Sequence, residues 1–232
     1  MERAKLINML VQEFGKTYSR LLGIDLSSSK SDEIFKWFLV SILFGARISE
    51  SIAMKTYKEF EKKRVLSPKR IIDTGWDGLV AILDEGGYVR YDFKTATKLL
   101  DITGKLSKEY NGDLNILHSK AKDARDVEGK IMNLGKGIGQ VTTAIFLREM
   151  RGIWEKADPL PTILIIESVK NLGFTKENSG EKILQDLKSV WNKFKIKGKN
   201  FVQFETALLR LGKNWCRKKK CEQCPFSSYC QK

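Results

Sequence analysis

The four cysteines of the chain lie close together near its C-terminal end, at Cys216, Cys221, Cys224 and Cys230. Thiolates separated by a few residues are typical ligands of one metal site, which can hold either a zinc ion or an iron-sulfur cluster. Disulfides are the alternative, but they need an oxidising compartment, and the charged segment Met1–Lys5 does not begin a signal peptide. The spacing therefore predicts a four-thiolate metal site in a protein that stays inside the cell, and leaves the metal open.

The glycine-rich segment 134–140 is a second candidate site, because it separates a helical run that ends near Met132 from another that spans Val141–Met150. Glycine permits positive φ and leaves no side chain between the backbone and an approaching group. The helix that follows directs its free N–H groups and the positive end of its dipole toward the same point, which suits a phosphate. A plain turn between two helices explains the glycines equally well.

Asp158 is the candidate for chemistry with a carboxylate, in the segment Ala157–Pro161 that follows this second helix. An Asp followed by Pro is a common start of a helix, so we expect Asp158 at the start of the next one. A carboxylate at that place could stabilise a cationic sugar or orient a water molecule for attack. Capping of the helix alone is the simpler interpretation of the same residue.

The charge balance points to a polyanion as the partner. Lys and Arg total 42 against 28 Asp and Glu, a formal net charge of +14. Nucleic acid is the leading partner. Membrane surfaces also attract basic proteins, but the longest uncharged apolar run, residues 37–46, is too short to cross a bilayer. Solvated lysines on helix faces could account for the charge without any binding.

The elements that position these residues are predicted to be helices throughout. Apolar residues recur at helical spacing, for example from Leu6 to Phe14, and no run alternates with the period of a strand. Ser67-Pro68 has the form of a helix start, and Asn111-Gly112 that of a helix end. The sequence therefore predicts an all-α protein. Loop-like stretches divide it into a central lobe, 28–151, and a second lobe formed by 1–27 and 152–232.

The glycine hairpin between helices, the Asp beyond the next helix and the C-terminal cysteines together resemble the endonuclease III branch of the helix-hairpin-helix DNA glycosylases. The resemblance covers nearly the whole chain and implies hydrolysis of an N-glycosidic bond in DNA after the target nucleotide is flipped out. It gives Asp158 the position of the catalytic aspartate. It also implies that Gly137, Gly139 and the following amides, Gln140 first, grip a phosphate, with Lys136 adding charge.

Two further segments gain a role only from this resemblance. Arg47 falls where family members carry a residue that fills the gap left by the flipped base, and a planar guanidinium suits that task. Tyr88 and Arg90 belong to a loop, 88–91, that stands where the family has a second wedge. Aromatic and basic side chains together suit an opened base stack, so we expect Tyr88 and Arg90 to contact DNA.

The chain departs from the family at two places. Val141 stands where bifunctional members carry the lysine that forms a Schiff base, so we expect water as the nucleophile and little or no lyase activity, with Lys136 as a weak substitute. Four residues rather than six separate the first two cysteines, while the later spacings match. The resemblance favours a structural [4Fe-4S] cluster over zinc. Four cations fill that shortened spacer and are expected to bind backbone phosphate, namely Arg217, Lys218, Lys219 and Lys220.

The sequence thus predicts a monomeric, monofunctional DNA repair glycosylase of the cytoplasm and nucleoid, acting on double-stranded DNA. Loss of the lysine favours mismatched, alkylated or modified bases over oxidised pyrimidines. The alternative is a non-catalytic helix-hairpin-helix DNA-binding protein with a structural zinc ion. A nuclease would need a cluster of metal-binding carboxylates that the sequence does not suggest.

Overall fold

The structure is a computed structural model that describes residues 2–231, and in that range every regular element is helical. The single departure is an isolated bridge between Arg151 and Trp154. The predicted all-α class is therefore confirmed. None of the helices in residues 2–231 is long and apolar enough to span a membrane.

The chain divides into two compact units, residues 22–159 and residues 1–21 with 160–232. The sequence placed these boundaries near residues 28 and 151. The segment before residue 28 belongs with the central unit because Lys58 donates a hydrogen bond to the carbonyl of Leu22 (3.5 Å) and Glu33 accepts one from the amide of Asp25 (2.8 Å). The segment after residue 151 is held to the same unit by side chains described below.

The central unit is built around α3, most of whose residues are buried. Trp37 of α3 donates a hydrogen bond through Nε1 to the carbonyl of Phe146 in α9 (3.0 Å), and Phe38 packs edge-on against the ring of Phe146. Burial of side chains of this size stabilises the fold by roughly 1.5–3 kcal/mol each. The unit contains, in chain order, η1 (Leu26–Ser28), α3 (Ser31–Phe44), α4 (Glu50–Lys62), α5 (Pro68–Glu85), α6 (Asp92–Tyr110), α7 (Leu114–Ser119), α8 (Ala124–Met132) and α9 (Gln140–Met150).

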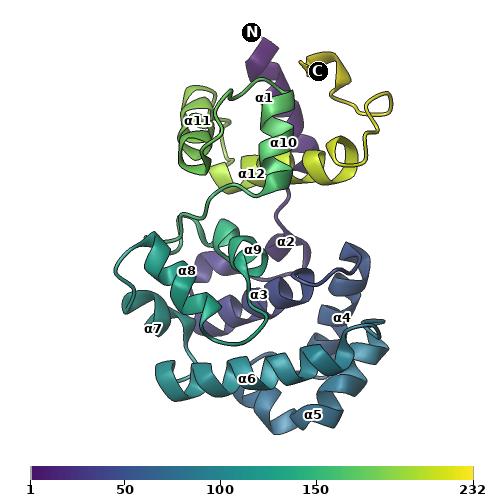
Figure 1. Ribbon diagram of the computed structural model, residues 1–232, viewed down its shortest axis with the longest axis vertical. Coiled ribbons are helices and arrows are strands. Elements are labelled where there is room, and N and C mark those ends of the chain that lie inside the picture. The colour runs from purple at the N-terminus through teal and green to yellow at the C-terminus, as the bar shows by residue number, and fades with distance from the viewer. Residues whose placement is uncertain (1, 232) are drawn as a thin grey trace. The chain divides into compact units, whose positions relative to one another are not determined.

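Helices α5 and α6 run side by side as an antiparallel pair (Figure 1). Both predicted helix boundaries are confirmed here. Ser67, directly before Pro68, caps α5 by accepting a hydrogen bond from the amide of Arg70. Helix α6 ends at Asn111, which has the left-handed conformation. A kink at Gly75, with φ of 68°, divides α5 into two helical parts.

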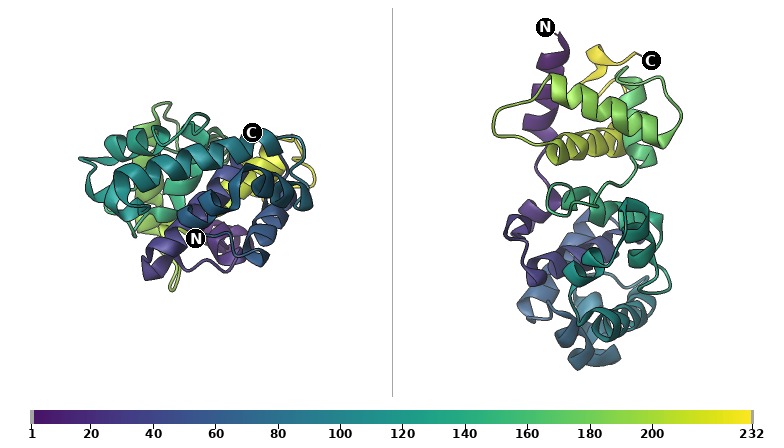
Figure 2. Two further views of the ribbon diagram at one scale, coloured as in Figure 1. Left: turned by 90° about the horizontal axis from the view of Figure 1, so that it is seen from below. Right: turned by 90° about the vertical axis from the view of Figure 1, so that its left-hand side faces the viewer.

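The other unit consists of α1 (Glu2–Phe14), α2 (Tyr18–Leu21), α10 (Ile163–Asn171), α11 (Gly180–Lys193), α12 (Phe201–Leu211), a π-helical turn η2 (Gly212–Cys216) and η3 (Ser227–Tyr229). The nearly buried α12 packs against α1 and α10 (Figures 1 and 2). A capping box between Asn200 and Gln203 starts α12. The chain continues from α12 directly into η2, and close packing requires glycine at the junction, because a β-carbon at Gly212 would lie only 2.0 Å from the carbonyl oxygen of Leu164.

Candidate nucleic-acid interface

The glycine hairpin connects α8 to α9 as the sequence predicts. Its two apolar residues, Leu134 and Ile138, are 1% and 6% exposed and hold it to the central unit. The amide of Ile138 donates a hydrogen bond to the carbonyl of Gly135 (3.2 Å), which closes the turn. Lys136, Gly137 and Gly139 between and beside these anchors are exposed. The hairpin therefore exposes its backbone to solvent, while the buried side chains of Leu134 and Ile138 hold it in place.

Two of the hairpin glycines are required by close contacts with α6. A β-carbon at Gly135 would come within 2.7 Å of the Ile102 side chain. Gly137 has φ of +89°, and a β-carbon there would lie 2.8 Å from Cε of Lys98. Since L-amino acids disfavour that backbone conformation, a side chain at Gly137 would be strained, and it would also displace the end of the Lys98 side chain. The hairpin thus lies directly against α6.

The N-terminus of α9 is open to solvent. Its N-cap, Gly139, has an extended conformation and no side chain to cap the helix. The first turn carries no acidic residue, and Gln140 and Val141 are exposed, Val141 by 62%. By contrast, Asp123 caps α8 by accepting hydrogen bonds from two amides. An anion at the start of α9 would therefore meet free helix-end amides and no competing carboxylate of the first turn.

The connection between α3 and α4, which carries Arg47, lies beside this helix start. A β-carbon at Gly45 would be 2.1 Å from Oγ1 of Thr142, so the end of α3 approaches the first turn of α9 closely. Arg47 itself is exposed and has no hydrogen bond or ion pair with residues 2–231. Arg47 therefore lies two residues after a glycine that packs on the first turn of α9, a packing contact that no pattern in the sequence indicates.

The loop between α5 and α6 corrects the expectation for Tyr88. Its ring is completely buried, and its hydroxyl donates a hydrogen bond to the carbonyl of Leu43 at the end of α3 (2.7 Å). Burial also raises the pKa of Tyr88 above its ordinary range. Tyr88 is therefore an anchor of the loop rather than a side chain that can contact DNA. The exposed members are Val89, which is 63% exposed, and Arg90, whose guanidinium lies over the ring of Tyr91 (5.5 Å).

Asp158 lies in the extended connection that follows α9, not at a helix start as expected. Helix α10 begins later, at Ile163 with Thr162 as its N-cap. Pro161 accounts for the difference, because the residue before a proline is kept out of the helical conformation. The carboxylate of Asp158 forms an ion pair with Arg151, whose other nitrogen donates to the carbonyl of Pro159. The side chain of Asp158 remains 38% exposed and that of Arg151 only 7%.

This connection is fixed to α7 and α8 through Trp154, Lys156 and Asp158. Arg125 of α8 donates a hydrogen bond to the carbonyl of Asp158 (2.7 Å) and pairs with Glu128 (2.6 Å). Trp154 is 3% exposed, donates to the Asn115 side chain (2.8 Å) and stacks on the ring of His118. Asp158 is therefore held by an ordered network within the central unit.

Glu128 has an environment that favours its neutral form. Burial raises the pKa of this carboxyl above its ordinary value, and the charge of Arg125 opposes that effect. The nearby carboxylate of Asp158 acts in the same direction as burial. Two carboxyl groups and two guanidinium groups thus lie close together here, and no sequence pattern associates Glu128 with Asp158.

The cysteine loop belongs to the unit of residues 1–21 and 160–232. Arg217, Lys218, Lys219 and Lys220 are all exposed, and Lys219 has φ of 53°. Aromatic contacts hold the two ends of the loop: Phe14 stacks on Trp215 (4.9 Å) and meets Phe226 edge-on (5.6 Å), and Phe226 is 1% exposed. The basic segment is therefore displayed between two packed ends.

The four thiols share one neighbourhood but are not in a ligand arrangement. Burial raises the pKa of the Cys216 thiol, and the charges of Cys224 and Cys230 act in the same direction. Burial likewise raises the pKa of the Cys224 thiol, and the charges of Cys230 and Cys221 act in the same direction. Within residues 2–231, however, no three metal-binding side chains already lie close enough to hold an ion. Four soft thiolate donors on one exposed loop fit the chemistry of a zinc ion or an iron-sulfur cluster.

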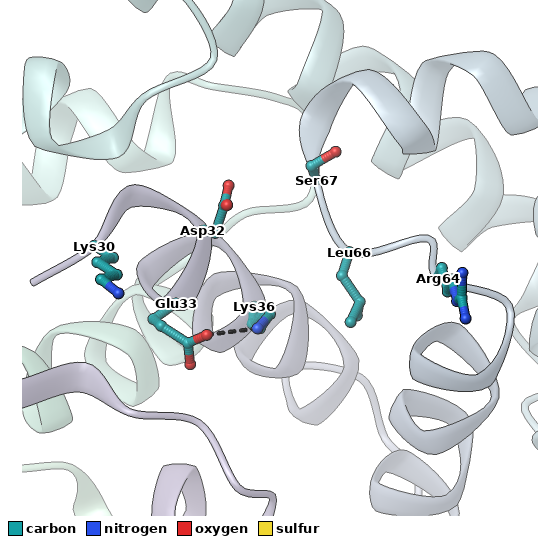
Figure 3. A pocket seen from close by; sticks show the side chains of 7 residues that line it. All are labelled: Lys30, Asp32, Glu33, Lys36, Arg64, Leu66 and Ser67. Atoms are coloured by element: carbon teal, nitrogen blue, oxygen red, sulfur yellow. Dashed lines mark hydrogen bonds and ion pairs between the residues drawn. The ribbon is translucent and has the colours of Figure 1, made fainter. Parts of the chain in front are cut away.

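A cavity of about 560 Å³ in the central unit lies elsewhere, at the N-terminal ends of α3 and α5 (Figure 3). An ion pair between Lys36 and Glu33 (2.5 Å) crosses its wall. None of the residues predicted for DNA binding or catalysis lines it. Its lining consists of Lys30, Asp32, Glu33, Lys36, Arg64, Leu66 and Ser67.

Known structures share this fold, although no protein-family model and no curated protein matches the sequence. A thermostable thymine-DNA glycosylase superposes with a TM-score of 0.58 at 18% identity, over 99% of this chain and 96% of its own. The 3-methyladenine DNA glycosylase of H. pylori bound to 1,N6-ethenoadenine gives 0.56 at 12% identity, over 94% and 98%. An endonuclease III trapped as a covalent intermediate with DNA gives 0.53 at 20% identity, over 84% and 82%.

All three of these neighbours are DNA glycosylases. The chain therefore has the helix-hairpin-helix DNA glycosylase fold, and the resemblance read from its motifs is confirmed at the level of the fold.

Proposed function

We propose that the protein is a DNA repair glycosylase that hydrolyses the N-glycosidic bond of a damaged, modified or mismatched base in double-stranded DNA. The observation that carries the proposal is the convergence of three segments around the bare start of α9. Gly45 approaches Thr142, Tyr88 is bonded to Leu43, and the hairpin lies on α6. Arg47, Arg90 and Lys136 are exposed on these segments of the central unit, and the backbone amides at the start of α9 suit a phosphate, which supports the proposal.

Asp158 is proposed as the carboxylate that stabilises the cationic sugar. In the reaction the bond between C1′ and the base nitrogen breaks, and its electron pair leaves with the base, which takes up a proton. A water oxygen then bonds to C1′ and loses a proton, so the products are the free base and an abasic site. The ion pair with Arg151 fixes the orientation of Asp158, while its 38% exposure leaves the side chain within reach of solvent. Electrostatic stabilisation of this kind is often the largest single contribution to catalysis.

The nucleophile is proposed to be water rather than an amine. Val141 in the first turn of α9 carries an apolar side chain and cannot form a Schiff base. Lys136, five residues earlier in the exposed part of the hairpin, is the nearest amine in the sequence. We expect lyase activity from it to be weak or absent.

The cysteine loop is proposed to bind a [4Fe-4S] cluster, with zinc as the alternative. Cys216, Cys221, Cys224 and Cys230 would be the ligands. The metal would hold the segment Arg217–Lys220 in one conformation so that its four cations meet the DNA backbone. It takes no part in the glycosidic step.

The proposal is tested with duplexes that each carry one altered base, incubated with the wild-type protein and with Asp158→Asn. The series includes a G·T mismatch, uracil and 1,N6-ethenoadenine, with the samples divided into alkali-treated and untreated halves. Alkali-dependent cleavage that falls about 100-fold or more in Asp158→Asn is expected. Glu155→Gln removes an exposed carboxylate from the same connection and should act as wild type.

Other outcomes have distinct meanings. Cleavage without alkali, together with a covalent adduct after borohydride, would replace water by an amine as the nucleophile. Tight DNA binding with no cleavage of any duplex would identify a non-catalytic helix-hairpin-helix protein. Equal activity of Asp158→Asn and the wild type would remove Asp158 from the mechanism and leave the glycosylase activity standing.

A further inference from the structure

Lys98 of α6 is a half-buried cation that points at the glycine hairpin. A β-carbon at Gly137 would lie 2.8 Å from its Cε and 3.2 Å from its Nζ, so the end of this side chain passes directly over the Gly137 backbone. Gly137 is exposed, and its lack of a side chain leaves the backbone accessible beside the ammonium group. Gly137 lies only two residues before Gly139, the N-cap at the open start of α9.

The ammonium group has no partner within the described part of the chain. No hydrogen bond and no ion pair joins Lys98 to any of residues 2–231. Burial lowers the pKa of Lys98, as expected for a cation that loses water without gaining an anion. Lys105, two turns later on the same face of α6, is different, because it donates to the carbonyl of Asn133 (2.6 Å) and lies 3.9 Å from Glu109.

We propose that Lys98 and the hairpin amides together hold one phosphate of the DNA backbone, with the phosphate between the ammonium group and the start of α9. This inference rests on the proposed function and adds to it a phosphate-binding residue from a helix outside the hairpin. A phosphate supplies the negative charge that Lys98 lacks, and it meets N–H groups that have no side-chain cap. Partial burial makes the interaction stronger than that of a fully solvated lysine.

Lys98→Met separates this role from a structural one. Methionine retains the apolar stem up to the position of Cε and removes only the ammonium group. Since that group is desolvated and unpaired in residues 2–231, we expect the variant to melt at the same temperature as wild type or higher. DNA affinity should nevertheless fall about fivefold to tenfold at roughly 0.1 M salt, and the salt slope should decrease by about 0.9, the value for one phosphate contact.

Lys108→Met is the matched control. Lys108 is exposed near the other end of α6, about 15 Å along the helix axis from Lys98, so it removes the same charge at a different place. We expect its DNA affinity and salt slope to remain close to wild type. Equal losses in the two variants would overturn the proposal, because they would show an effect of net charge alone.

A second measurement uses the wild-type protein. Reductive methylation followed by mass spectrometry should modify Lys98 readily in the free protein and slowly when duplex DNA is bound, whereas Lys108 should react equally in both states. Unchanged labelling of Lys98, or unchanged affinity of Lys98→Met, would overturn this inference while DNA binding by the wild type stands. Absence of duplex binding by the wild type would overturn both this inference and the proposed function.

Discussion

The glycine hairpin and the cysteine loop are both short connections proposed to meet DNA, but they acquire their shapes by different means. The hairpin is held by two buried side chains, Leu134 and Ile138, and by close contact of its glycines with α6. In the cysteine loop the side chains of the basic segment 217–220 are exposed. The segment is held by backbone hydrogen bonds from Arg217, Lys219 and Lys220 to residues 212–216 and by packing of its two ends, through Trp215 and Phe226. Buried side chains therefore hold the hairpin along its length, whereas segment 217–220 buries none of its own, and we propose that a metal on the thiols restrains it further.

The largest effect is expected from breaking the proposed metal site with Cys224→Ser. Loss of one of four ligands should remove the metal, and structural metals contribute heavily to the stability of the segments that they close, by about 10 kcal/mol or more in small metal-dependent domains. Metal and sulfide analysis should find an iron-sulfur cluster in the wild type and none in the variant. Amide exchange should accelerate in residues 212–231 and stay unchanged in α3–α9.

Ser228→Ala, an exposed substitution in the same loop, is the control and should keep its metal. Zinc in the wild type would replace the cluster without changing the comparison. Amide exchange of residues 212–231 that is as slow in Cys224→Ser as in the wild type would contradict the difference between the two sites, since the loop would then keep its shape without a metal.

A smaller but definite loss is expected from Gly137→Ala. The added methyl group meets Lys98 and must adopt φ near +89°, so the variant should lose about 1–3 kcal/mol of unfolding free energy. Displacement of the hairpin should also weaken DNA binding. Gly139→Ala offers a matched control, because its backbone is extended and a β-carbon there has nothing within 4 Å. Denaturant unfolding that shows the same stability for both variants would mean that packing against α6 does not shape the hairpin.

Much of the hairpin region could be predicted because its signals are local. Glycines between two helical runs, a serine and proline at the start of α5, and Asn111-Gly112 at the end of α6 act through the backbone of their own segments. The helical class and the hairpin itself therefore followed from the sequence. The bare N-cap of α9 is also readable there, since Gly139 has no side chain.

Features that depend on distant segments could not be read in this way. The sequence predicts that Tyr88 contacts DNA, yet its hydroxyl donates a hydrogen bond to the carbonyl of Leu43 at the end of α3. No local pattern marks a tyrosine as buried. Asp158 looked like a helix start because Pro159 follows it, but Pro161 delays α10 to Ile163. Two further features arise only when segments far apart in the sequence meet. Lys98 lies against the hairpin without an anionic partner in residues 2–231, and Gly45 approaches Thr142.

The smallest predicted effect tests whether the connection that carries Asp158 is held by packing in the same way as the hairpin. His118 stacks on Trp154 (4.7 Å), and its Nε2 accepts a hydrogen bond from the amide of Lys156 (3.3 Å). Burial lowers the pKa of His118 below its ordinary value of 6.5, and the charge of Lys156 lowers it further. The unfolded chain therefore binds a proton at a pH where the folded chain does not, so this contribution to stability is present above pH 6.5 and is lost as the pH falls below it.

Protonation would also oppose the hydrogen bond from Lys156, because a charged imidazole has no acceptor nitrogen. We expect the wild-type melting temperature to fall between about pH 7.5 and pH 5.5 by on the order of one degree more than that of His118→Phe. Phenylalanine keeps a ring against Trp154 but does not titrate in this range. Calorimetry of both proteins across that interval measures the difference directly. Parallel pH profiles of the two melting temperatures would show that a neutral His118 does not stabilise this connection. The ion pair of Asp158 with Arg151 would then be its main support.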